Sequence, residues 1–208
     1  MSPAASRVGV VDSGICNLGS ICHALQQAGG DVGVIASPSD MEQYSHVVLP
    51  GVGSFPAGMD ALTARGLDAA IQQFAAKGGL LLGICLGMQL LFETGHEFET
   101  RKGLGLIPGQ VRQLHAAGLA LPHMGWNQLE LKRPDALTAG LSDEPFLYFV
   151  HSFACEPANA ADVVATCTHG ESFCALVQRG NVRGLQAHPE KSQQCGRQIL
   201  RAFLELAP

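Results

Sequence analysis

The sequence predicts a single α/β domain that covers residues 1–208, with a mostly parallel central sheet and helices on both of its faces. Three observations predict this fold class. Several short runs are apolar at every position, which is typical of strands buried on both faces of a sheet. Segments with helical spacing of apolar residues lie between these runs. A chain of 208 residues is also long enough for one well-buried domain and too short for two large ones.

The first half of the chain supplies the expected parallel strands. They are the apolar runs Val8 to Val11, Val32 to Ile35, Val47 to Leu49 and Leu80 to Ile84. Helices are expected at Leu18 to Leu25, Leu67 to Phe74 and Met88 to Phe92. Apolar residues recur there at helical spacing, and glycine pairs at 29–30 and 78–79 end the first two helices.

The pattern changes at about Gly103, where short strands with Gly and Pro turns begin. These extra strands are expected at Gly109 to Leu114, Gln128 to Leu131, Phe146 to Val150 and Val182 to Leu185. A last helix is expected at Gln193 to Leu206, with Ile199, Leu200 and Phe203 facing the core. The sequence contains no internal repeat, low-complexity stretch or linker, so these elements extend the same domain.

Composition restricts the classes of function. Hydrophobic residues make up 47% and charged residues 15% of the chain, so a solid core is expected and disorder is not. The net charge of -5 and the lack of a Lys/Arg cluster argue against a nucleic-acid partner. The longest apolar run is too short for a membrane span, and residues 1–6 lack the pattern of a signal peptide. We therefore expect a cytoplasmic protein.

The seven cysteines predict neither a disulfide framework nor a metal site. Their number is odd, and no two of them form a Cys-x-x-Cys pair. In a reducing cytosol most of them should be small buried apolar residues. We expect no metal and no cofactor, and only Cys85 lies in a segment that predicts chemistry.

Cys85 lies between an expected strand and an expected helix, with Gly83 and Gly87 two positions away on either side. This is the arrangement of a nucleophile elbow, in which a tight turn strains the backbone and small neighbours avoid clashes. The turn directs the sulfur toward the start of a helix, whose N–H groups favour a thiolate. The simpler alternative is a buried cysteine in a glycine-rich turn.

His188 and Glu190 follow the expected strand that ends at Leu185. A thiol needs a base that takes and returns its proton, and an imidazole needs a carboxylate that holds its orientation. The two residues flank Pro189, and in an extended stretch their side chains would share one face. A histidine before proline is usually only a loop residue, but together with the cysteine elbow it predicts a Cys–His–Glu triad.

A third segment follows the expected strand that ends at Leu49. Gly51, Val52 and Gly53 form a loop whose peptide N–H groups can turn toward a substrate oxygen. Such donors stabilise the oxyanion that forms when sulfur attacks a carbonyl, by about 3–4 kcal/mol per donor. The alternatives are a plain tight turn and a phosphate-binding loop, although no Gly-Lys-Ser/Thr follows.

Together these segments resemble the class I (triad) glutamine amidotransferase family over almost the whole chain. The signature is Gly-Ile-Cys-Leu-Gly-Met-Gln at 83–89 with His-Pro-Glu at 188–190. His-Met-Gly-Trp-Asn at 123–127, Tyr-Phe-Val-His-Ser at 148–152 and Lys-Ser at 191–192 look like the glutaminase subunits of imidazole glycerol phosphate synthase. The resemblance implies a flavodoxin-like glutamine amidotransferase type 1 domain over residues 1–208.

The resemblance also implies a function in histidine biosynthesis. Such a subunit hydrolyses L-glutamine to glutamate and ammonia, and forms a heterodimer with the cyclase subunit of imidazole glycerol phosphate synthase. The cyclase uses the ammonia and releases the purine precursor AICAR as by-product. A partner is needed because ammonia released into water would be protonated and would lose its nucleophilicity.

Individual roles carry over by position. The resemblance implies that Cys85 is the nucleophile, His188 the base and acid, and Glu190 the residue that orients the imidazole. The implied oxyanion hole consists of Leu86 with Gly51, Val52 and Gly53. The implied glutamine-binding residues are Gln89, Glu97, Ser152 and Phe153. The implied partner-facing residues are Trp126, Tyr148 and Lys191, for which a core Trp and Tyr and a solvated Lys are the simpler readings.

The chain departs from the family pattern at four positions. Ala187 and Phe153 stand where the family commonly has an aromatic residue and a tyrosine, and Ser13 and Gly19 replace an aromatic residue and an arginine. Three alternatives for function also stay open. They are a cysteine hydrolase or peptidase with the same elbow, a glutaminase subunit of a different synthase, and a non-catalytic binding module.

Overall fold

Parallel strands form the centre of the molecule in the computed structural model, which describes residues 7–207. Their order across the sheet is β2 (Asp31–Ile35), β1 (Arg7–Val11), β3 (His46–Gly51), β4 (Leu80–Cys85) and β14 (Val182–Leu185). Every residue of the last three strands is buried. Burial on both faces explains why most of their positions are apolar, and the buried Arg183 of β14 lies 3.6 Å from the carboxylate of Asp135.

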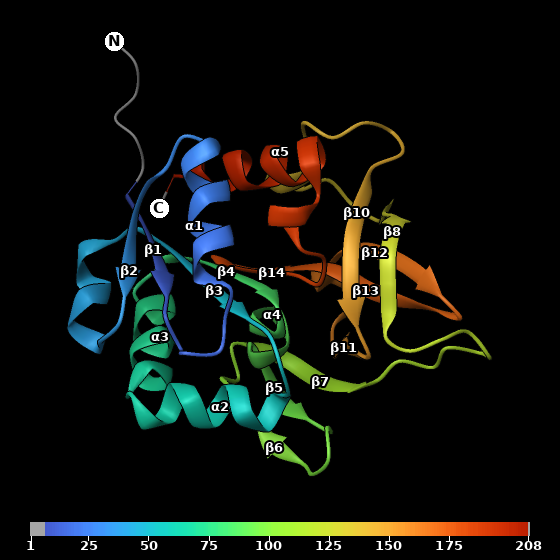
Figure 1. Ribbon diagram of the computed structural model, residues 1–208, viewed down its shortest axis with the longest axis horizontal. Helices are drawn as coiled ribbons and strands as arrows, with labels where there is room; N and C mark the ends of the chain where they lie inside the picture. The colour runs from blue at the N-terminus through green and yellow to red at the C-terminus, as the bar shows by residue number, and fades with distance from the viewer. Residues whose placement is uncertain (1–6, 208) are drawn as a thin grey trace.

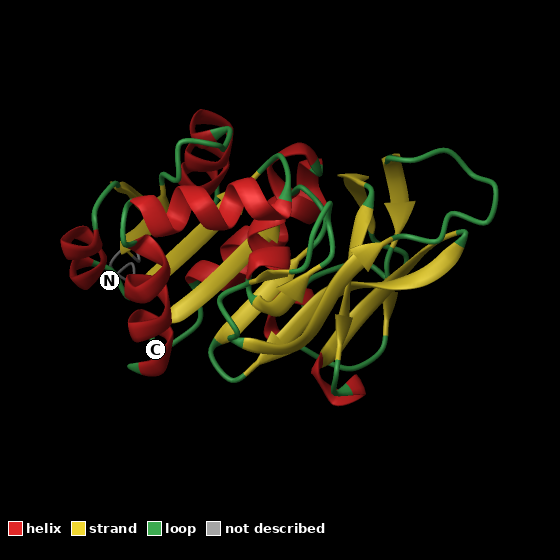
Figure 2. Ribbon diagram, turned by 90° about the horizontal axis from the view of Figure 1, so that it is seen from below, coloured by secondary structure: helices red, strands yellow, loops and turns green. Residues whose placement is uncertain are grey.

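Helices cover both faces of these strands, as Figures 1 and 2 show. They are α1 (Leu18–Gln27), α2 (Phe55–Ala64), α3 (Leu67–Ala76), α4 (Leu86–Leu90) and α5 (Gln193–Leu204). Neighbouring residues of β4 enter two different cores. Leu82 packs in the cluster that contains Leu25 of α1 and Phe203 of α5, whereas Leu81 packs with Ile71 of α3. The predicted fold class, an α/β domain with a mostly parallel sheet, is confirmed.

The second half of the chain extends the sheet beyond β14. The next strands across are β13 (Glu171–Arg179), β11 (Phe153–Pro157), β7 (Ile107–Gln113), β5 (Phe92–Gly95) and β6 (Arg101–Lys102). Pairing is antiparallel here except between β5 and β7. The strand β12 (Val163–His169) pairs with β13 and with β9 (Glu130–Leu131).

A separate two-stranded antiparallel sheet contains β8 (His123–Gln128) and β10 (Phe146–His151). It lies beside the antiparallel half of the main sheet (Figure 1). Short 3-10 turns complete the described chain: η1 (Pro38–Gln43), η2 (Ala136–Thr138), η3 (Ala160–Asp162) and η4 (Pro189–Lys191).

Two expected elements were wrong. The helix expected at Met88 to Phe92 begins at Leu86 and ends at Leu90, because Phe92 instead opens β5 and pairs with Ile107 of β7. The single strand expected at Gln128 to Leu131 is divided between β8 and β9, which pair with different strands. Leu129 lies between them with 2% of its surface exposed, so it anchors the break in the core.

The helix α2 was not expected at all. Its sequence carries a recognisable start, with Ser54 before it and Pro56 in its first turn. Two other differences are small: the last helix ends at Leu204 rather than Leu206, and most strands are longer than expected by one or two residues. Ile199, Leu200 and Phe203 of that helix are fully buried, as expected.

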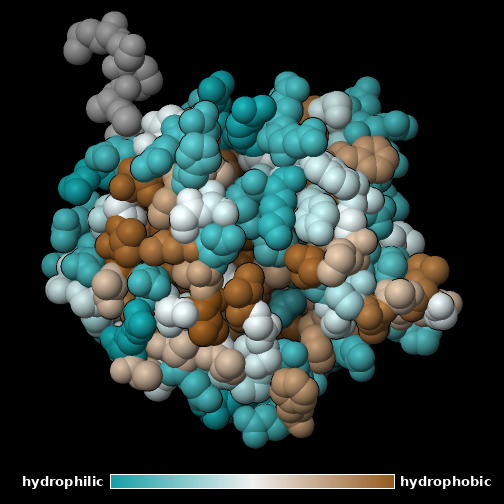
Figure 3. Space-filling model, viewed as in Figure 1, coloured by the Kyte–Doolittle hydropathy of each residue, from teal (hydrophilic) through white to brown (hydrophobic). Residues whose placement is uncertain are grey.

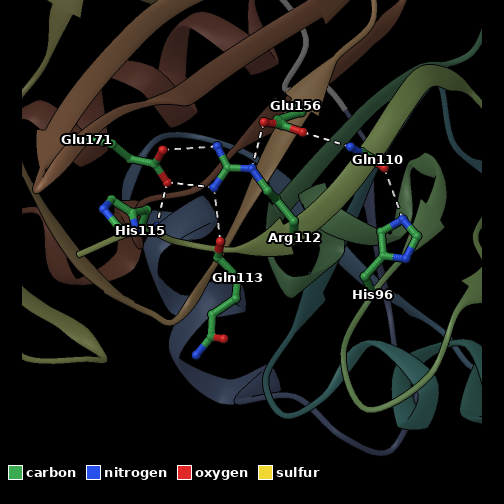
Figure 4. A network of polar contacts seen from close by, with 7 residues as sticks. All are labelled: His96, Gln110, Arg112, Gln113, His115, Glu156 and Glu171. Atoms are coloured by element: carbon green, nitrogen blue, oxygen red, sulfur yellow. Dashed lines mark hydrogen bonds and ion pairs between the residues drawn. The ribbon is translucent and has the colours of Figure 1, made fainter. Parts of the chain in front are cut away.

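Figure 3 shows mostly hydrophilic residues on one face of the molecule, with hydrophobic patches toward its middle. Arg112 joins three strands of the antiparallel half (Figure 4). Its guanidinium lies 2.6 Å from Glu156 of β11 and 2.6 Å from Glu171 of β13. Hydrogen bonds with Glu171, followed by those with Glu156, outweigh partial burial and raise the pKa of Arg112. The network fixes β7 against its neighbours, and with it the segment that leads to Phe153.

Candidate active site

The backbone is strained at Cys85, where β4 ends and α4 begins. Cys85 has φ 54° and ψ -113°, a conformation that non-glycine residues rarely adopt. Holding a residue in such a region costs about 1–3 kcal/mol, and such residues cluster at functional sites. This conformation directs the side chain of Cys85 out of the strand, between the last residues of β4 and the first residue of α4.

The two flanking glycines make this turn possible. A Cβ atom at Gly87 would overlap the carbonyl oxygen of Leu49 in β3. A Cβ atom at Gly83 would lie 2.6 Å from the carbonyl oxygen of Gly87, also too close. Glycine is therefore required at both positions for α4 to turn back over the sheet, as the sequence pattern predicted.

The sulfur of Cys85 is buried, with 7% of the residue's surface exposed. Nε2 of Gln186 lies 3.8 Å from the sulfur, and the carbonyl oxygen of Val150 lies 3.9 Å from it. The sulfur therefore has both a donor and an acceptor beside it. The helix α4 contains only five residues, so its contribution comes from its first N–H groups rather than from a long helix dipole.

His188 and Glu190 form a close hydrogen-bonded pair. Nδ1 of His188 lies 2.7 Å from Oε1 of Glu190, and the side chains are 5% and 9% exposed. The prediction of an extended stretch between them was wrong, because Pro189 begins the 3-10 turn η4, and this turn brings the carboxylate within hydrogen-bond distance of Nδ1. Ser192 fixes this turn by donating from Oγ to the carbonyl oxygen of His188, at 2.6 Å.

The environment of His188 favours its charged form. Burial lowers the pKa of the imidazole, but hydrogen bonds and charge attraction from Cys85 and Glu190 outweigh burial and raise the pKa to about 10. Because Nδ1 is held by Glu190, the proton exchanged with Cys85 must be on Nε2. Nε2 is buried and makes no regular hydrogen bond with the described residues, so it is available for proton transfer.

A pocket of about 340 Å³ opens in front of Cys85 and His188. The other lining residues are Val52, Gly53, Leu86, Gln89, Glu97, Pro122, Val150, His151, Ser152 and Phe153. The pocket thus contains all four of the expected glutamine-binding residues, brought together from α4, the chain after β5, and the junction of β10 and β11. Its volume suits a small, amino-acid-sized ligand.

Polar contacts hold the walls of this pocket in place. Nε2 of Gln89 lies 3.1 Å from the carbonyl oxygen of Phe153. Nδ1 of His151 lies 2.8 Å from the same oxygen. One carboxylate oxygen of Glu97 accepts from the main-chain N–H of Phe55, at 2.7 Å, which places the negative charge of Glu97 at the pocket and at the start of α2.

The expected oxyanion loop is only partly directed at the pocket. Val52, Gly53 and Leu86 line the pocket, whereas Gly51 lines a small cavity behind it, with His188 and Glu190. The N–H of Val52 donates to the carbonyl oxygen of Ile15, at 3.1 Å, and so points away from Cys85. Gly53 has φ 103°, which only glycine adopts easily, so the loop has the backbone freedom to turn.

The family comparison decides what kind of protein carries this site. The model of the family described as glutamine amidotransferase class-I matches residues 9–206 of the chain. The chain belongs to this family.

Relatives of this amidotransferase cover nearly its full length. This chain is 43% identical over 204 residues to "Imidazole glycerol phosphate synthase subunit HisH" of Synechococcus sp. (strain JA-3-3Ab). The match covers 97% of this chain and 94% of the relative. The chain is 44% identical over 199 residues to the protein of the same name from Moorella thermoacetica, covering 96% of this chain and 94% of the relative.

Solved structures agree on the fold of the amidotransferase. The structure described as PurLQS from Thermotoga maritima superposes with a TM-score of 0.76 at 22% identity, covering 96% of this chain and 98% of the matched one. A structure described as a glutamine amidotransferase superposes with a TM-score of 0.75 at 20% identity, covering 95% and 97%. At these identities the likeness concerns the fold alone.

The three expected partner-facing residues of the amidotransferase lie together. Trp126 of β8 is directly opposite Tyr148 of β10, and their ring centroids are 6.2 Å apart in an edge-on arrangement. Nζ of Lys191 lies 5.5 Å from the centroid of the Tyr148 ring. Trp126 is 47% exposed and its neighbour Met124 is 63% exposed, so this sheet presents an apolar surface rather than a buried core.

Sequence reasoning assigned no role to several residues that line the site. Gln186, Val150 and His151 contact either the nucleophile or the wall of the pocket. Gln186 lies two positions before His188, so alternation along the end of β14 is a signal that could have revealed it. The contacts of Val150 depend on the pairing of distant strands and leave no local signal.

Of the four departures from the family pattern, Phe153 lines the pocket, and only its main-chain oxygen contacts Gln89 and His151; the other three do not line the pocket. Ala187 is fully buried in a hydrophobic cluster, and Ser13 is 6% exposed. Gly19 lies on the exposed side of α1. Within residues 7–207, no group of His, Cys, Asp and Glu side chains has the arrangement of a metal site, and no helix is long and apolar enough to cross a membrane.

Proposed function

We propose that the chain is the glutaminase subunit of imidazole glycerol phosphate synthase and that it functions as one domain over residues 1–208. It hydrolyses L-glutamine to glutamate and ammonia, and its cyclase partner consumes the ammonia in histidine biosynthesis, releasing AICAR as by-product. The observation that supports this best is the Cys85–His188–Glu190 arrangement at the end of a pocket of about 340 Å³. The relatives named as subunits of that synthase support the choice of partner.

Binding of glutamine follows from the charges around the pocket. The carboxylate of Glu97 attracts the α-ammonium group of the substrate. Both N–H groups of Gln89 are used by protein acceptors, since its Nε2 lies 3.1 Å from both Phe153 O and Gln186 Oε1. Its carbonyl oxygen is therefore the part of Gln89 that faces glutamine. The main chain at Ser152 and Phe153 supplies the remaining contacts, which places the substrate amide at Cys85.

The reaction begins with the Cys85 thiolate and the His188 imidazolium. The sulfur attacks the side-chain carbonyl carbon of glutamine, and its oxygen gains the negative charge. Nε2 of His188 then gives its proton to the nitrogen as the C–N bond breaks, so ammonia leaves and a glutamyl thioester remains. Water loses a proton to Nε2 and attacks the thioester, which breaks the C–S bond and releases glutamate.

Glu190 keeps His188 effective through both steps. Its carboxylate accepts from Nδ1 and so directs Nε2 at the sulfur and the leaving nitrogen. The same charge stabilises the imidazolium, which must exist when the thiolate attacks. The pKa of His188, raised to about 10, supports the imidazolium form of its ring.

The surface that contains Trp126, Tyr148 and Lys191 contacts the cyclase. His188 connects this surface to the active site, because its main-chain N–H donates to the carbonyl oxygen of Tyr148 at 2.8 Å. Ammonia formed at Cys85 then has a short route into the partner. The chain acts in the cytoplasm, where its described cysteines remain reduced thiols.

The deciding experiment mixes the purified chain with the cyclase and compares two nitrogen sources. Turnover driven by glutamine must depend on the chain, whereas turnover driven by free ammonium must not. A cysteine peptidase with the same elbow would cleave peptides and leave the cyclase without ammonia. If glutamine drives turnover by a different synthase and not by this cyclase, then that synthase is the partner and the proposed one is wrong.

A further inference from the structure

Gln186 connects the nucleophile to the glutamine pocket. The residue is fully buried between the end of β14 and His188. Its Nε2 lies 3.8 Å from Sγ of Cys85, and its Oε1 lies 3.1 Å from Nε2 of Gln89. The side chain of Gln186 has no exposed surface, and its amide contacts the reacting sulfur atom. We therefore infer that this amide does more than fill space in the core.

The neighbouring groups fix which end of the Gln186 amide faces the sulfur. The carbonyl oxygen of Phe153 can only accept, so the Gln89 atom that lies 3.1 Å from it must be the amide nitrogen. The same nitrogen lies 3.1 Å from Gln186, which must therefore present its oxygen there. The NH₂ group of Gln186 is left facing Cys85. Gln186 is thus a hydrogen-bond donor to sulfur.

A donor in this position distinguishes the two protonation states of the sulfur. A thiolate accepts strongly, because hydrogen bonds to a charged acceptor are about twice as strong as neutral ones. The neutral thiol can instead donate to the carbonyl oxygen of Val150, 3.9 Å away. The amide of Gln186 therefore favours the thiolate and holds it in one direction, whereas His188 moves the proton.

We propose that Gln186 is a further catalytic residue of this site, which stabilises and orients the attacking sulfur of Cys85, and that Gln89 holds its amide in the donating orientation. This inference rests on the proposed glutaminase function. It also gives Gln89 a second role, since the residue that faces the substrate also sets the donor that faces the nucleophile.

Other titratable groups face the same sulfur and remain in place when Gln186 changes. They are His188, which precedes η4 and is paired with Glu190 of η4, together with His151 from β10, Glu97 after β5 and Cys155 from β11. Because these groups are common to all variants of Gln186, a difference between variants reports the amide itself.

Two substitutions separate the donor from the rest of the side chain. Gln186→Glu keeps the shape and the oxygen that accepts from Gln89, but it replaces the NH₂ group by a second oxygen. Gln186→Met keeps the length and removes both polar groups. The matched control is Gln72→Met on α3, where the lost contact is a hydrogen bond of 2.8 Å to the carbonyl oxygen of Leu104, away from the pocket.

Two readouts are measured on the chain assembled with its cyclase, in the presence of the nucleotide substrate that accepts the ammonia on the cyclase (the acceptor nucleotide). Steady-state glutamine hydrolysis gives kcat and KM separately. The rate of alkylation by iodoacetamide is followed by mass spectrometry on the peptide that contains Cys85, because the chain has seven cysteines. Circular dichroism establishes that each variant is folded.

Both Gln186 variants are expected to lower kcat by about ten- to a hundredfold, the effect of losing one hydrogen bond to a charged group. The glutamate variant should be the slower of the two, because its carboxylate repels a thiolate. Alkylation of Cys85 should slow in parallel, KM should change by less than about threefold, and Gln72→Met should behave as wild type.

The proposal is overturned by an unchanged kcat and alkylation rate in folded variants, or by a change confined to KM. In either case, hydrolysis of glutamine by the wild-type chain would still support the proposed function. A wild-type complex that fails to hydrolyse glutamine would instead reject the proposed function. If the methionine variant does not fold, the glutamate variant, which keeps the contact with Gln89, decides the question.

Discussion

Nδ1 of His188 lies 2.7 Å from Oε1 of Glu190, and both side chains are almost completely buried. This contact fixes the tautomer of the imidazole, since the proton on Nδ1 is held by the carboxylate and Nε2 alone faces the sulfur. A buried carboxylate also stabilises the imidazolium more than an exposed one would. Glu190 therefore acts on the reaction only through His188.

The first prediction compares these two residues. His188→Ala removes the proton carrier, and we expect a loss of kcat on the order of 10⁶, as in other hydrolase triads. Glu190→Gln keeps the shape but disturbs the tautomer, and a smaller loss of about 10⁴ is expected. The measurement is glutamine hydrolysis by each variant in the complex. A larger loss for Glu190→Gln than for His188→Ala would contradict the assigned roles.

The second prediction concerns Cys85. Cys85→Ala and Cys85→Ser should abolish glutamine hydrolysis, because the thiolate forms the covalent intermediate. Assembly with the cyclase should persist, since the change removes little packing. Free ammonium should still drive the cyclase reaction in the mutant complex. Product formed from glutamine by the alanine variant would refute the assignment of the nucleophile.

Sequence patterns were sufficient for the strands of the parallel half, because burial on both faces of the sheet leaves most of their positions apolar. The strand β14 was expected at Val182 to Leu185, its observed bounds. The antiparallel half was harder, since pairing there depends on distant segments. Leu129 illustrates this: the residues on either side of it belong to strands that pair with β10 and β12, and no local pattern records the change.

The helix α2 was missed for a different reason. Gly58 lies in its interior and lowers its helix propensity. The structure shows why a small residue is needed there, since a Cβ atom at Gly58 would lie 3.0 Å from the side chain of Leu90 in α4. Close packing between α2 and α4 thus outweighs local propensity. The packing information is not present in the segment itself.

The candidate site was easier to predict where its residues are neighbours in the chain. His188 and Glu190 are separated only by Pro189, and Gly83 and Gly87 flank Cys85, so short motifs carry their chemistry. The direction of the Val52 N–H could not be predicted, because it depends on a hydrogen bond with a loop that follows another strand.

The third prediction tests the geometry of the elbow. Gly87→Ala should prevent folding or destabilise the protein by several kcal/mol, because the new methyl group would overlap the carbonyl of Leu49. The matched control is Gly19→Ala in α1, where no atom lies within 4 Å of the added Cβ. That change should stabilise the protein by about 0.5 kcal/mol. Thermal unfolding measures both, and equal effects would contradict the elbow constraint.

The fourth prediction concerns acid stability. Burial, followed by the charge of His169, lowers the pKa of His123 to about 4; the pKa of His151 is lowered to about 3, again mainly by burial. Below the ordinary value of about 6.5, the unfolded chain binds more protons at these positions than the folded chain does. The free energy of unfolding should therefore fall as the pH falls from about 6.5 through these lowered values.

Chemical denaturation across this pH range measures that loss. His123→Asn removes one of the titrating groups, so its free energy of unfolding should depend less on pH than that of the wild type. His115→Asn, at an exposed position, is the control and should keep the wild-type slope. The pKa of His188 is raised to about 10, so its contribution is lost only as the pH rises above about 6.5, outside the acid range. Equal slopes in His123→Asn and the wild type would contradict this prediction.

The fifth prediction concerns coupling to the partner. In the resting chain the N–H of Val52 donates to Ile15 O at 3.1 Å, so one expected oxyanion donor is turned away from Cys85. A missing donor of this kind reduces turnover by about a hundred- to a thousandfold. Gly53, at φ 103°, gives the loop the freedom to turn, and a shift between the two loop states needs only a few kcal/mol, about what one interface can supply.

We therefore expect the isolated chain to be a poor glutaminase that becomes active when the cyclase binds its acceptor nucleotide. Steady-state hydrolysis is measured for the chain alone, with the cyclase, and with the cyclase and nucleotide. The increase should appear mainly in kcat, because the Val52 donor acts on the oxyanion of the transition state rather than on bound glutamine. A change confined to KM would indicate that the partner reshapes the glutamine pocket instead. Equal activity in all three mixtures would refute the coupling, and the hydrogen bond between Val52 and Ile15 would then have no regulatory role.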